Sequence, residues 1–203
     1  LARCLRGVLL DTDYAPLEVL IVDNDSRDRA ALDVLDRAQQ DPRVRRLNWS
    51  GSFNYSAINN MAASQAQGEV LCFLNNDVEV LHAGWLTEMV EQALREGIGA
   101  VGAKLYYPDG TVQHAGVVVG LRGVADHSHK GFSGADSGYF MRLKIVQEYS
   151  AVTAACMVIR RDAFEAVGGF ETQIFGHKRE AVLVARTQDN RIDFAGGAVF
   201  ESS

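Results

Sequence analysis

The sequence has few cysteines and no long apolar run. Cys4, Cys72 and Cys156 are far apart, and their odd number and spacing fit neither a disulfide framework nor a zinc site, which is typical of a reducing compartment. No apolar run approaches the roughly 20 residues that a membrane-spanning helix needs, and the chain opens without a signal peptide. These absences predict a cytoplasmic protein.

The sequence also lacks an excess of basic residues. Its net charge of -6 and pI near 5.4 provide no broad basic surface for phosphates, so nucleic acid is not an expected partner. A local cluster of Arg43, Arg45 and Arg46 could contact a phosphate or an anionic membrane. A solvated loop explains the same cluster, and we assign it no function.

What is present is an ordinary globular composition. The chain has 203 residues, 47% of them hydrophobic and 23% charged, with no internal repeat or low-complexity segment. Such a length suits one domain with a single core, which we expect over residues 1–203.

Segments of strand length alternate with segments of helical periodicity in the first half. Strands are predicted at residues 17–22, 44–48, 71–74 and 98–107, and helices at residues 1–10, 27–40, 55–67 and 84–96. Gly68 is the expected C-cap of the third helix, and the Pro-Asp-Gly at residues 108–110 predicts a turn. The alternation predicts an α/β fold with a mostly parallel sheet and helices on both faces.

The second half of the sequence differs from the first in composition and in periodicity. Residues 113–140 are rich in glycine and histidine and predict an extended excursion. Residues 150–170 return to order, with an apolar strand, a short helix at residues 161–167 and a Gly-Gly turn. We expect this half to cover a site rather than to form a core of its own.

Polar clusters follow two of the predicted strands. LEVLIV runs into DNDS at Asp23, and LCFL runs into Asn75, Asn76 and Asp77. The carboxyl ends of parallel strands share one edge, where ligands bind, so the two clusters should converge. Carboxylate and amide oxygens suit Mg²⁺ or Mn²⁺ with a nucleotide diphosphate. The alternative is that Asp23 and Asp77 are only turn residues and helix caps.

Four blocks of the sequence resemble one enzyme family. They are DNDSRD from Asp23, FNYSAINNMAASQAQGEVLCFLNNDVEV from Phe53, VGAKLYYPDGTVQHAGVVVG from Val101 and SAVTAACMVIRRDAFEAVGGF from Ser150. Their order and spacing are similar to the inverting family-2 glycosyltransferases, especially the bacterial rhamnosyl- and O-antigen-type branch, over about residues 1–175. The resemblance implies the GT-A (Rossmann-like) fold and a nucleotide-diphosphate sugar as donor.

The resemblance also implies roles for the residues at the strand ends. Asp23 and Asn24 would meet the base and ribose of the donor, and Asp77 would bind the metal or the pyrophosphate. Asn75 would orient the diphosphate, and Asn76 would be a further donor-binding residue.

Further residues belong to motifs that line the donor pocket in the family. Asn54, Asn59 and Asn60 would hydrogen-bond sugar hydroxyls or phosphate, whereas a capped helix with exposed amides is the alternative.

A histidine-rich region would lie near donor and acceptor in the same family. It contains Gln113, His114, His127, His129 and Lys130, and Lys130 would balance the charge of the diphosphate. Polar surface is the alternative for these histidines.

The chain departs from the family pattern at the catalytic base. Relatives carry an acidic motif after the GGF turn, and setting residues 183–186 against it assigns Glu180 as the base and puts Val182 where a second acid belongs. The alternative is a surface strand with no catalytic role. The family's first strand would precede Leu1, so we expect a central strand to be absent and a sheet edge to be exposed.

The resemblance implies an inverting hexosyltransferase in surface polysaccharide biosynthesis, with Mg²⁺ or Mn²⁺ and a UDP- or dTDP-sugar. Residues 1–107 would bind the nucleotide sugar, and residues 108–203 would form the acceptor side. The acceptor would be a saccharide or lipid-linked, and peripheral association with the inner face of the membrane is compatible with this. The alternatives are a degenerate nucleotide-sugar-binding domain without turnover and a sugar-phosphate nucleotidyltransferase.

Overall fold

The structure, a computed structural model, describes residues 1–120, 125–173, 181–186 and 198–201, the last two segments by their backbone. The chain forms two compact units, one of Leu1–Leu86 with Arg160–Asp189 and the other of Thr87–Ile159 with Asn190–Ser203. Each unit is described by itself below.

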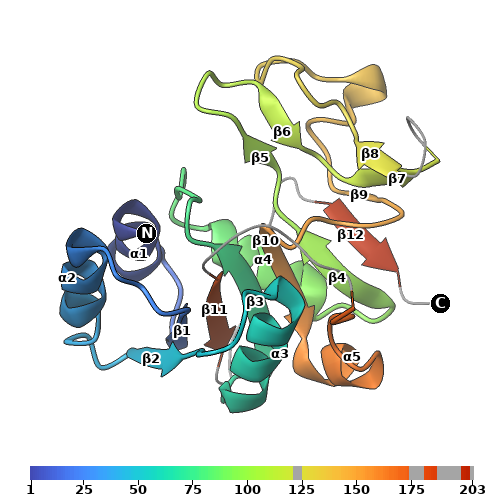
Figure 1. The fold of residues 1–203 in the computed structure, drawn as a ribbon. Helices are drawn as coiled ribbons and strands as arrows, with labels where there is room; N and C mark the ends of the chain where they lie inside the picture. The colour runs from blue at the N-terminus through green and yellow to red at the C-terminus, as the bar shows by residue number, and fades with distance from the viewer. Residues whose placement is uncertain (121–124, 174–180, 187–197, 202–203) are drawn as a thin grey trace. The chain divides into compact units, whose positions relative to one another are not determined.

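The first unit alternates helices and strands as predicted (Figure 1). Its helices are α1 (Ala2–Leu10), α2 (Arg29–Ala38), α3 (Tyr55–Gln65) and α5 (Arg161–Ala166), and its strands are β1 (Leu17–Asp23), β2 (Val44–Asn48), β3 (Val70–Asn75) and β11 (Ala181–Arg186). The predicted helix at residues 84–96 is α4 (Trp85–Ala93), which crosses the boundary between the units. Local periodicity therefore located the elements of this unit.

The strands of the first unit lie in the order β2-β1-β11-β3. β1 is parallel to β2, whereas β11 is antiparallel to both β1 and β3, so β1 and β3 run in the same direction. The expectation of an exposed edge at a vacant central position is wrong, because β11 pairs on both sides at that position. For the same reason, residues 181–186 are an internal strand and not a surface strand.

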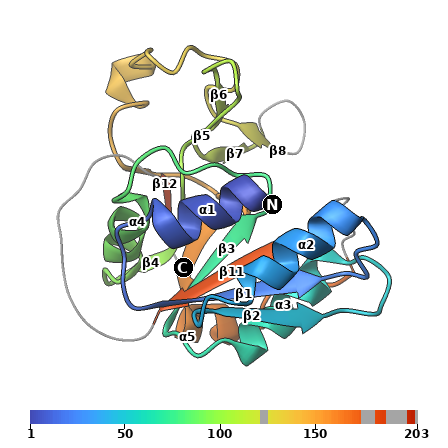
Figure 2. The ribbon, with the colours of Figure 1, turned by 90° about the vertical axis from the view of Figure 1, so that its left-hand side faces the viewer.

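Helices cover both faces of this sheet. In both ribbon views α1 and α2 lie on one face, and α3 and α5 lie on the other (Figures 1 and 2). The apolar strand residues are almost completely shielded from solvent: Val19, Leu20, Val22, Leu71, Phe73 and Leu74 are at most 2% exposed. The ring of Phe73 packs against Phe164 and Phe170, with centroids 5.0 and 4.8 Å away.

The C-terminus of α3 ends differently from the prediction. The helix stops at Gln65, and Gly68 is not its cap. Instead the guanidinium of Arg161 donates to the carbonyl oxygens of Gly68, Ala63 and Ala66, at 2.8, 2.9 and 2.8 Å. A charged fork thus binds one carbonyl in the last turn of α3 and two carbonyls in the segment that follows the helix.

The second unit is built mainly of short strands. Its elements are β4 (Ile98–Gly102), β5 (Leu105–Tyr106), β6 (Val112–His114), β7 (Val117–Val119), β8 (Ala125–His127), the 3-10 turn η1 (Tyr139–Met141), β9 (Gln147–Glu148), β10 (Cys156–Arg160) and β12 (Ala198–Glu201). The strand order is β10-β4-β12-β9, and β5-β6 and β7-β8 form two separate antiparallel pairs.

Two expectations for the second unit need correction. The predicted strand at residues 98–107 is divided into β4 and β5, because β5 leaves the sheet and pairs with β6 instead. The histidine-rich half was expected to have no core, yet Val112, Ala115 and Leu143 form a small buried cluster of its own. The predicted turn at residues 108–110 is present, with Gly110 at φ +82°.

No helix in the described part of the chain is long and apolar enough to cross a membrane.

Candidate functional site

The two predicted polar clusters lie at one edge of the first unit's sheet. The backbone of Ala181 pairs with Val22 on one side and with Asn75 on the other. The carboxyl ends of β1 and β3 are therefore level and separated by a single strand, which corresponds to about 10 Å. Asp23 and Asp77 follow at that shared edge, as the sequence pattern predicted.

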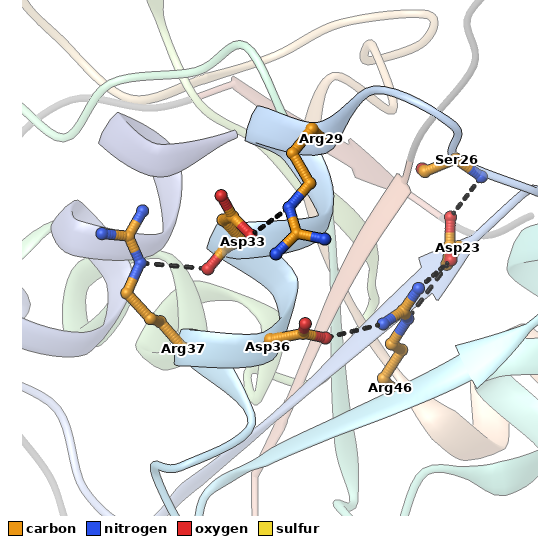
Figure 3. Close-up of polar contacts among 7 residues, drawn as sticks. All are labelled: Asp23, Ser26, Arg29, Asp33, Asp36, Arg37 and Arg46. Atoms are coloured by element: carbon orange, nitrogen blue, oxygen red, sulfur yellow. Dashed lines mark hydrogen bonds and ion pairs between the residues drawn. The ribbon is translucent and has the colours of Figure 1, made fainter.

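Asp23 is held in a fixed position at the end of β1 (Figure 3). Its side chain is only 6% exposed, and Oδ1 accepts a 2.9 Å hydrogen bond from the backbone N–H of Ser26. Oδ2 accepts from Nε and Nη2 of Arg46, at 3.2 and 2.5 Å. Burial raises the pKa of Asp23, but hydrogen bonds from Ser26 and Arg46 outweigh it and leave the pKa below its ordinary value. The group is an oriented carboxylate at neutral pH.

Arg46 is a site residue that the sequence reasoning missed. Its side chain is 18% exposed, and Nη1 forms an ion pair with Asp36 on α2, 3.3 Å away. Arg46 is opposite Ile21 in the β1–β2 register, so it is the diagonal neighbour of Asp23 on the same face. Of the three arginines in the cluster, Arg45 and Arg46 lie on β2, whereas Arg43 lies in the turn that precedes it. Arg46 can be assigned to the site only when the register between β1 and β2 is known.

The helix beside this network carries its own ion pair. On α2, Nε of Arg29 lies 3.0 Å from a carboxylate oxygen of Asp33, and Nε of Arg37 donates to the Asp33 carbonyl oxygen (Figure 3). These exposed contacts lie within α2 and do not position Asp23 at the end of β1.

Asn24 uses both of its side-chain N–H groups within the protein. Nδ2 donates to the carbonyl oxygens of Trp49 and Gly51, each at 3.1 Å, and so fixes the loop that follows β2. Because both N–H groups of the Asn24 side chain are used within the protein, a ligand would meet the amide oxygen of this residue.

The end of β3 brings Asp77 to the surface. Asn75 is 5% exposed, and its carbonyl oxygen accepts hydrogen bonds from the N–H of Val78 at 3.3 Å and from Sγ of Cys4 at 3.5 Å. Asn76 is half-buried and Asp77 is exposed. The turn therefore presents a carboxylate to solvent at the shared edge.

Two of the predicted donor-pocket amides act as structural ties. Asn54 caps α3 by accepting from the N–H of Ala57 at 3.0 Å, and its Nδ2 donates to the Thr172 carbonyl oxygen at 2.8 Å. Asn60 makes two bonds to the backbone of Phe170, at 2.8 and 2.9 Å. Asn54 thus caps α3, as one alternative expected, and Asn60 ties the helix to Phe170, whereas their contact with a donor stays a prediction.

Asn59 is enclosed and cannot meet a donor sugar in this conformation. It is 1% exposed, and its Nδ2 donates to the Tyr55 carbonyl oxygen at 2.8 Å. No donor among the described residues reaches its Oδ1.

Two histidines of the second unit, His114 and His127, form a pair. His114 is fully buried, and its Nδ1 lies 2.6 Å from Nδ1 of His127. Nε2 of His114 accepts from the N–H groups of Gly116 and Thr153, at 3.3 and 3.5 Å, so its proton must reside on Nδ1 and be donated to His127. Burial and then the neighbouring His127 lower the pKa of His114 to about 4. Polar surface does not describe this pair.

This buried histidine predicts a pH dependence of stability. The unfolded chain takes up a proton at His114 below about pH 6.5, whereas the folded chain does so only near pH 4. We expect the contribution of neutral His114 to the free energy of unfolding, about 3 kcal/mol, to be fully present above pH 6.5 and to be lost as the pH falls toward 4. Urea unfolding of the wild type and of His114→Gln from pH 7.5 to 4.5 measures it. The exposed His82→Gln is the matched control, and parallel curves for wild type and His114→Gln would refute the prediction.

Two further predicted site residues, Lys130 and Glu180, are not placed at the shared edge by the described residues of the first unit. Lys130 is exposed in the second unit, and Glu180 lies outside the described residues. Among the described residues, no three histidine, cysteine or carboxylate side chains gather to hold a metal ion by themselves.

Comparisons with known proteins identify relatives. The family Glycosyl transferase family 2 matches residues 1–168. "Uncharacterized protein y4gI" of Sinorhizobium fredii (strain NBRC 101917 / NGR234) is 51% identical over 170 residues, 83% of this chain and 19% of the relative. The O-antigen biosynthesis protein RfbC of Myxococcus xanthus is 45% identical over 195 residues, 95% of this chain and 15% of the relative. The chain spans less than a fifth of the length of these curated relatives.

A solved structure shares the fold. The mannosyltransferase PcManGT from Pyrobaculum calidifontis, in complex with GDP-Man and Mn2+, is similar with a TM-score of 0.60 and 17% identity, over 84% of this chain and 43% of that chain. This likeness confirms the predicted α/β class and GT-A architecture. Because the family match covers most of its length, the chain belongs to glycosyl transferase family 2.

Proposed function

We propose that this chain is the donor-binding and catalytic domain of a glycosyltransferase that transfers a hexose with inversion in surface polysaccharide biosynthesis. The donor is a nucleotide-diphosphate sugar, and the acceptor is a saccharide or a lipid-linked saccharide. The observation that carries the proposal is the shared edge, at which Ala181 pairs with both Val22 and Asn75. The name of the Myxococcus xanthus relative, O-antigen biosynthesis protein, supports the same class of product.

The hydrogen bonds of Asp23 favour a pyrimidine nucleotide. A carboxylate has about four acceptor positions, and the protein uses one on Oδ1 and two on Oδ2. The position left on Oδ1 suits the single imide N–H of uracil or thymine. Guanine presents two adjacent donors and would need both oxygens. We therefore propose a UDP- or dTDP-sugar as donor, with the oxygen of Asn24 toward the ribose.

The residues at the end of β3 suit a metal ion that takes most of its ligands from water and from the phosphates of the donor. Mg²⁺ and Mn²⁺ commonly bind through one or two carboxylates and take their other ligands from water and phosphates. Asp77 supplies one exposed carboxylate, flanked by the half-buried Asn76, and this suits such an ion better than a closed protein cage. When bound, the ion would stabilise the charge of the leaving diphosphate. Lys130 is proposed to add positive charge.

Glu180 is our proposed general base. It precedes Ala181 directly in the sequence, and Ala181 is the residue between the two strand ends. Its carboxylate would take the proton of the acceptor hydroxyl as the new glycosidic bond forms and the diphosphate leaves. We place the reaction in the cytoplasm, because three buried cysteines that are far apart in the sequence are typical of a reducing compartment, and we propose that it takes place at the inner face of the membrane.

The decisive experiment uses the wild-type chain. Calorimetry with UDP, dTDP and GDP, with and without Mn²⁺, measures binding, and hydrolysis of the corresponding nucleotide sugars measures turnover. We expect Mn²⁺-dependent binding of UDP or dTDP with slow donor hydrolysis. Binding without turnover would favour a degenerate donor-binding domain, and formation of a nucleotide sugar from a nucleoside triphosphate and a sugar phosphate would favour a nucleotidyltransferase. Absence of any nucleotide binding would overturn the proposal.

A further inference from the structure

The second unit displays large apolar side chains on one short turn. Within the segment of residues 139–145, here called the aromatic turn, Tyr139, Phe140 and Met141 are 71%, 78% and 54% exposed, and Ile145 is 51% exposed. The rings of Tyr139 and Phe140 contact each other edge to face at 4.5 Å. Such a cluster at the surface of a folded protein commonly marks an interaction site.

The backbone holds these side chains outward in an unusual conformation. Phe140 and Met141 have φ values of +48° and +64°, a left-handed region that large side chains rarely adopt. The turn begins after Gly138, at φ +65°, whose N–H donates to Asp136 at 2.7 Å. Strained residues persist only where their surroundings fix them, and they cluster at functional sites.

The far side of the turn is anchored in the small core of the second unit. Leu143 is 4% exposed, and its carbonyl oxygen accepts a 2.8 Å hydrogen bond from Nζ of Lys104. Nε of Arg142 donates to Oε1 of Gln147 at 2.8 Å. In both ribbon views the gold turn lies at the end of the second unit that is remote from β4 (Figures 1 and 2). The contacts of Leu143 and Arg142 therefore fix the backbone that carries the exposed rings of Tyr139 and Phe140.

The charge of the turn differs from that of the chain. The chain carries a net charge of -6, whereas the aromatic turn, YFMRLKI, contains Arg142 and Lys144 and no acid. Aromatic side chains favour the interface between water and lipid, and neighbouring basic side chains are attracted to anionic headgroups. The composition of the turn is complementary to an anionic bilayer surface.

We propose that the aromatic turn inserts into the headgroup region of an anionic phospholipid bilayer and holds the enzyme at the membrane. A saccharide platform fits less well, since Met141 and Ile145 offer no hydrogen bonds to hydroxyls and Arg142 already uses Nε on Gln147. The proposal relies on the proposed function only for its purpose, which is access to a lipid-linked acceptor. Vesicle binding needs neither donor nor acceptor, so the two proposals can fail separately.

The test is co-sedimentation with vesicles of phosphatidylcholine alone and of phosphatidylcholine mixed with phosphatidylglycerol. We expect the wild type to bind the mixed vesicles at least about tenfold more strongly than the neutral ones, and less strongly in high salt. The double variant Phe140→Asn, Met141→Asn should lose binding, since asparagine accepts the left-handed conformation without the apolar surface. Arg142→Gln with Lys144→Gln should lose the preference for anionic vesicles.

Val119→Asn, at a residue of the second unit that is 65% exposed, is the matched control and should bind as the wild type does. Circular dichroism and urea unfolding of each variant confirm that the fold is retained. A second readout is Phe140→Trp, whose emission should shift to the blue on the mixed vesicles. Equal sedimentation of wild type and the Phe140/Met141 variant would overturn the proposal, as would binding of acceptor oligosaccharides through the same residues without vesicle binding.

Discussion

Glu180→Gln should lower the rate of sugar transfer by on the order of 10² to 10⁴ while leaving the donor affinity unchanged. The amide keeps the size of the side chain but cannot take the proton of the acceptor hydroxyl, so only the chemical step loses its stabilisation. Single-turnover transfer and calorimetric donor binding must be measured separately, because KM would mix the two effects.

The exposed Glu171→Gln is the matched control, since Glu171 lies in the same stretch of sequence after the Gly-Gly turn. It should transfer at the wild-type rate. If Glu180→Gln does so too, Glu180 is not the base, and the chain lacks the general base that we assign to it.

Asp77→Asn should abolish Mn²⁺-dependent nucleotide binding, with an affinity for UDP or dTDP at least roughly 100-fold weaker, and leave the fold intact. The substitution removes the exposed carboxylate at the end of β3, whereas the buried core residues beneath it are unchanged. Calorimetry with and without Mn²⁺ measures the loss, and urea unfolding checks stability.

Glu79→Gln is the control for general charge in this stretch. Glu79 is exposed, and its contact is an ion pair with the exposed Arg3 at 3.6 Å. An Asp77→Asn variant that retains its Mn²⁺-dependent affinity, or a Glu79→Gln variant that loses as much, would place the metal elsewhere.

The sequence predicted the parts of the site that depend on local pattern. Strand length, apolar periodicity and the polar residues at Asp23 and Asn75 are all local signals, and the common direction of β1 and β3 brings these two ends to one edge. The same reasoning missed Arg46, because its contact with Asp23 depends on the register between strands that are separated by a helix. The pairing of His114 with His127 likewise depends on a hairpin whose register the sequence does not state.

The roles of the amide residues depend on contacts that the sequence does not state. Asn54, Asn59 and Asn60 lie in a motif that suggests donor contacts, yet the structure uses Asn54 and Asn60 to tie loops to α3 and encloses Asn59. An amide both donates and accepts, so it serves a helix end or a backbone turn as readily as a sugar. Sequence alone cannot decide between these uses, because the partner atoms belong to residues far along the chain.

The fork of Arg161 at the end of α3 also has a consequence during synthesis of the chain. The carbonyls that it binds precede it by 93 to 98 residues, an interval that a ribosome needs on the order of 10 s to translate. Until Arg161 emerges, the carbonyls of Ala66 and Gly68 lack this partner, and until residues 181–186 follow, β1 and β3 each present an unpaired strand edge. The nascent first unit is therefore exposed to misassociation for most of its synthesis, and its sheet closes only when the last of its strands has been made.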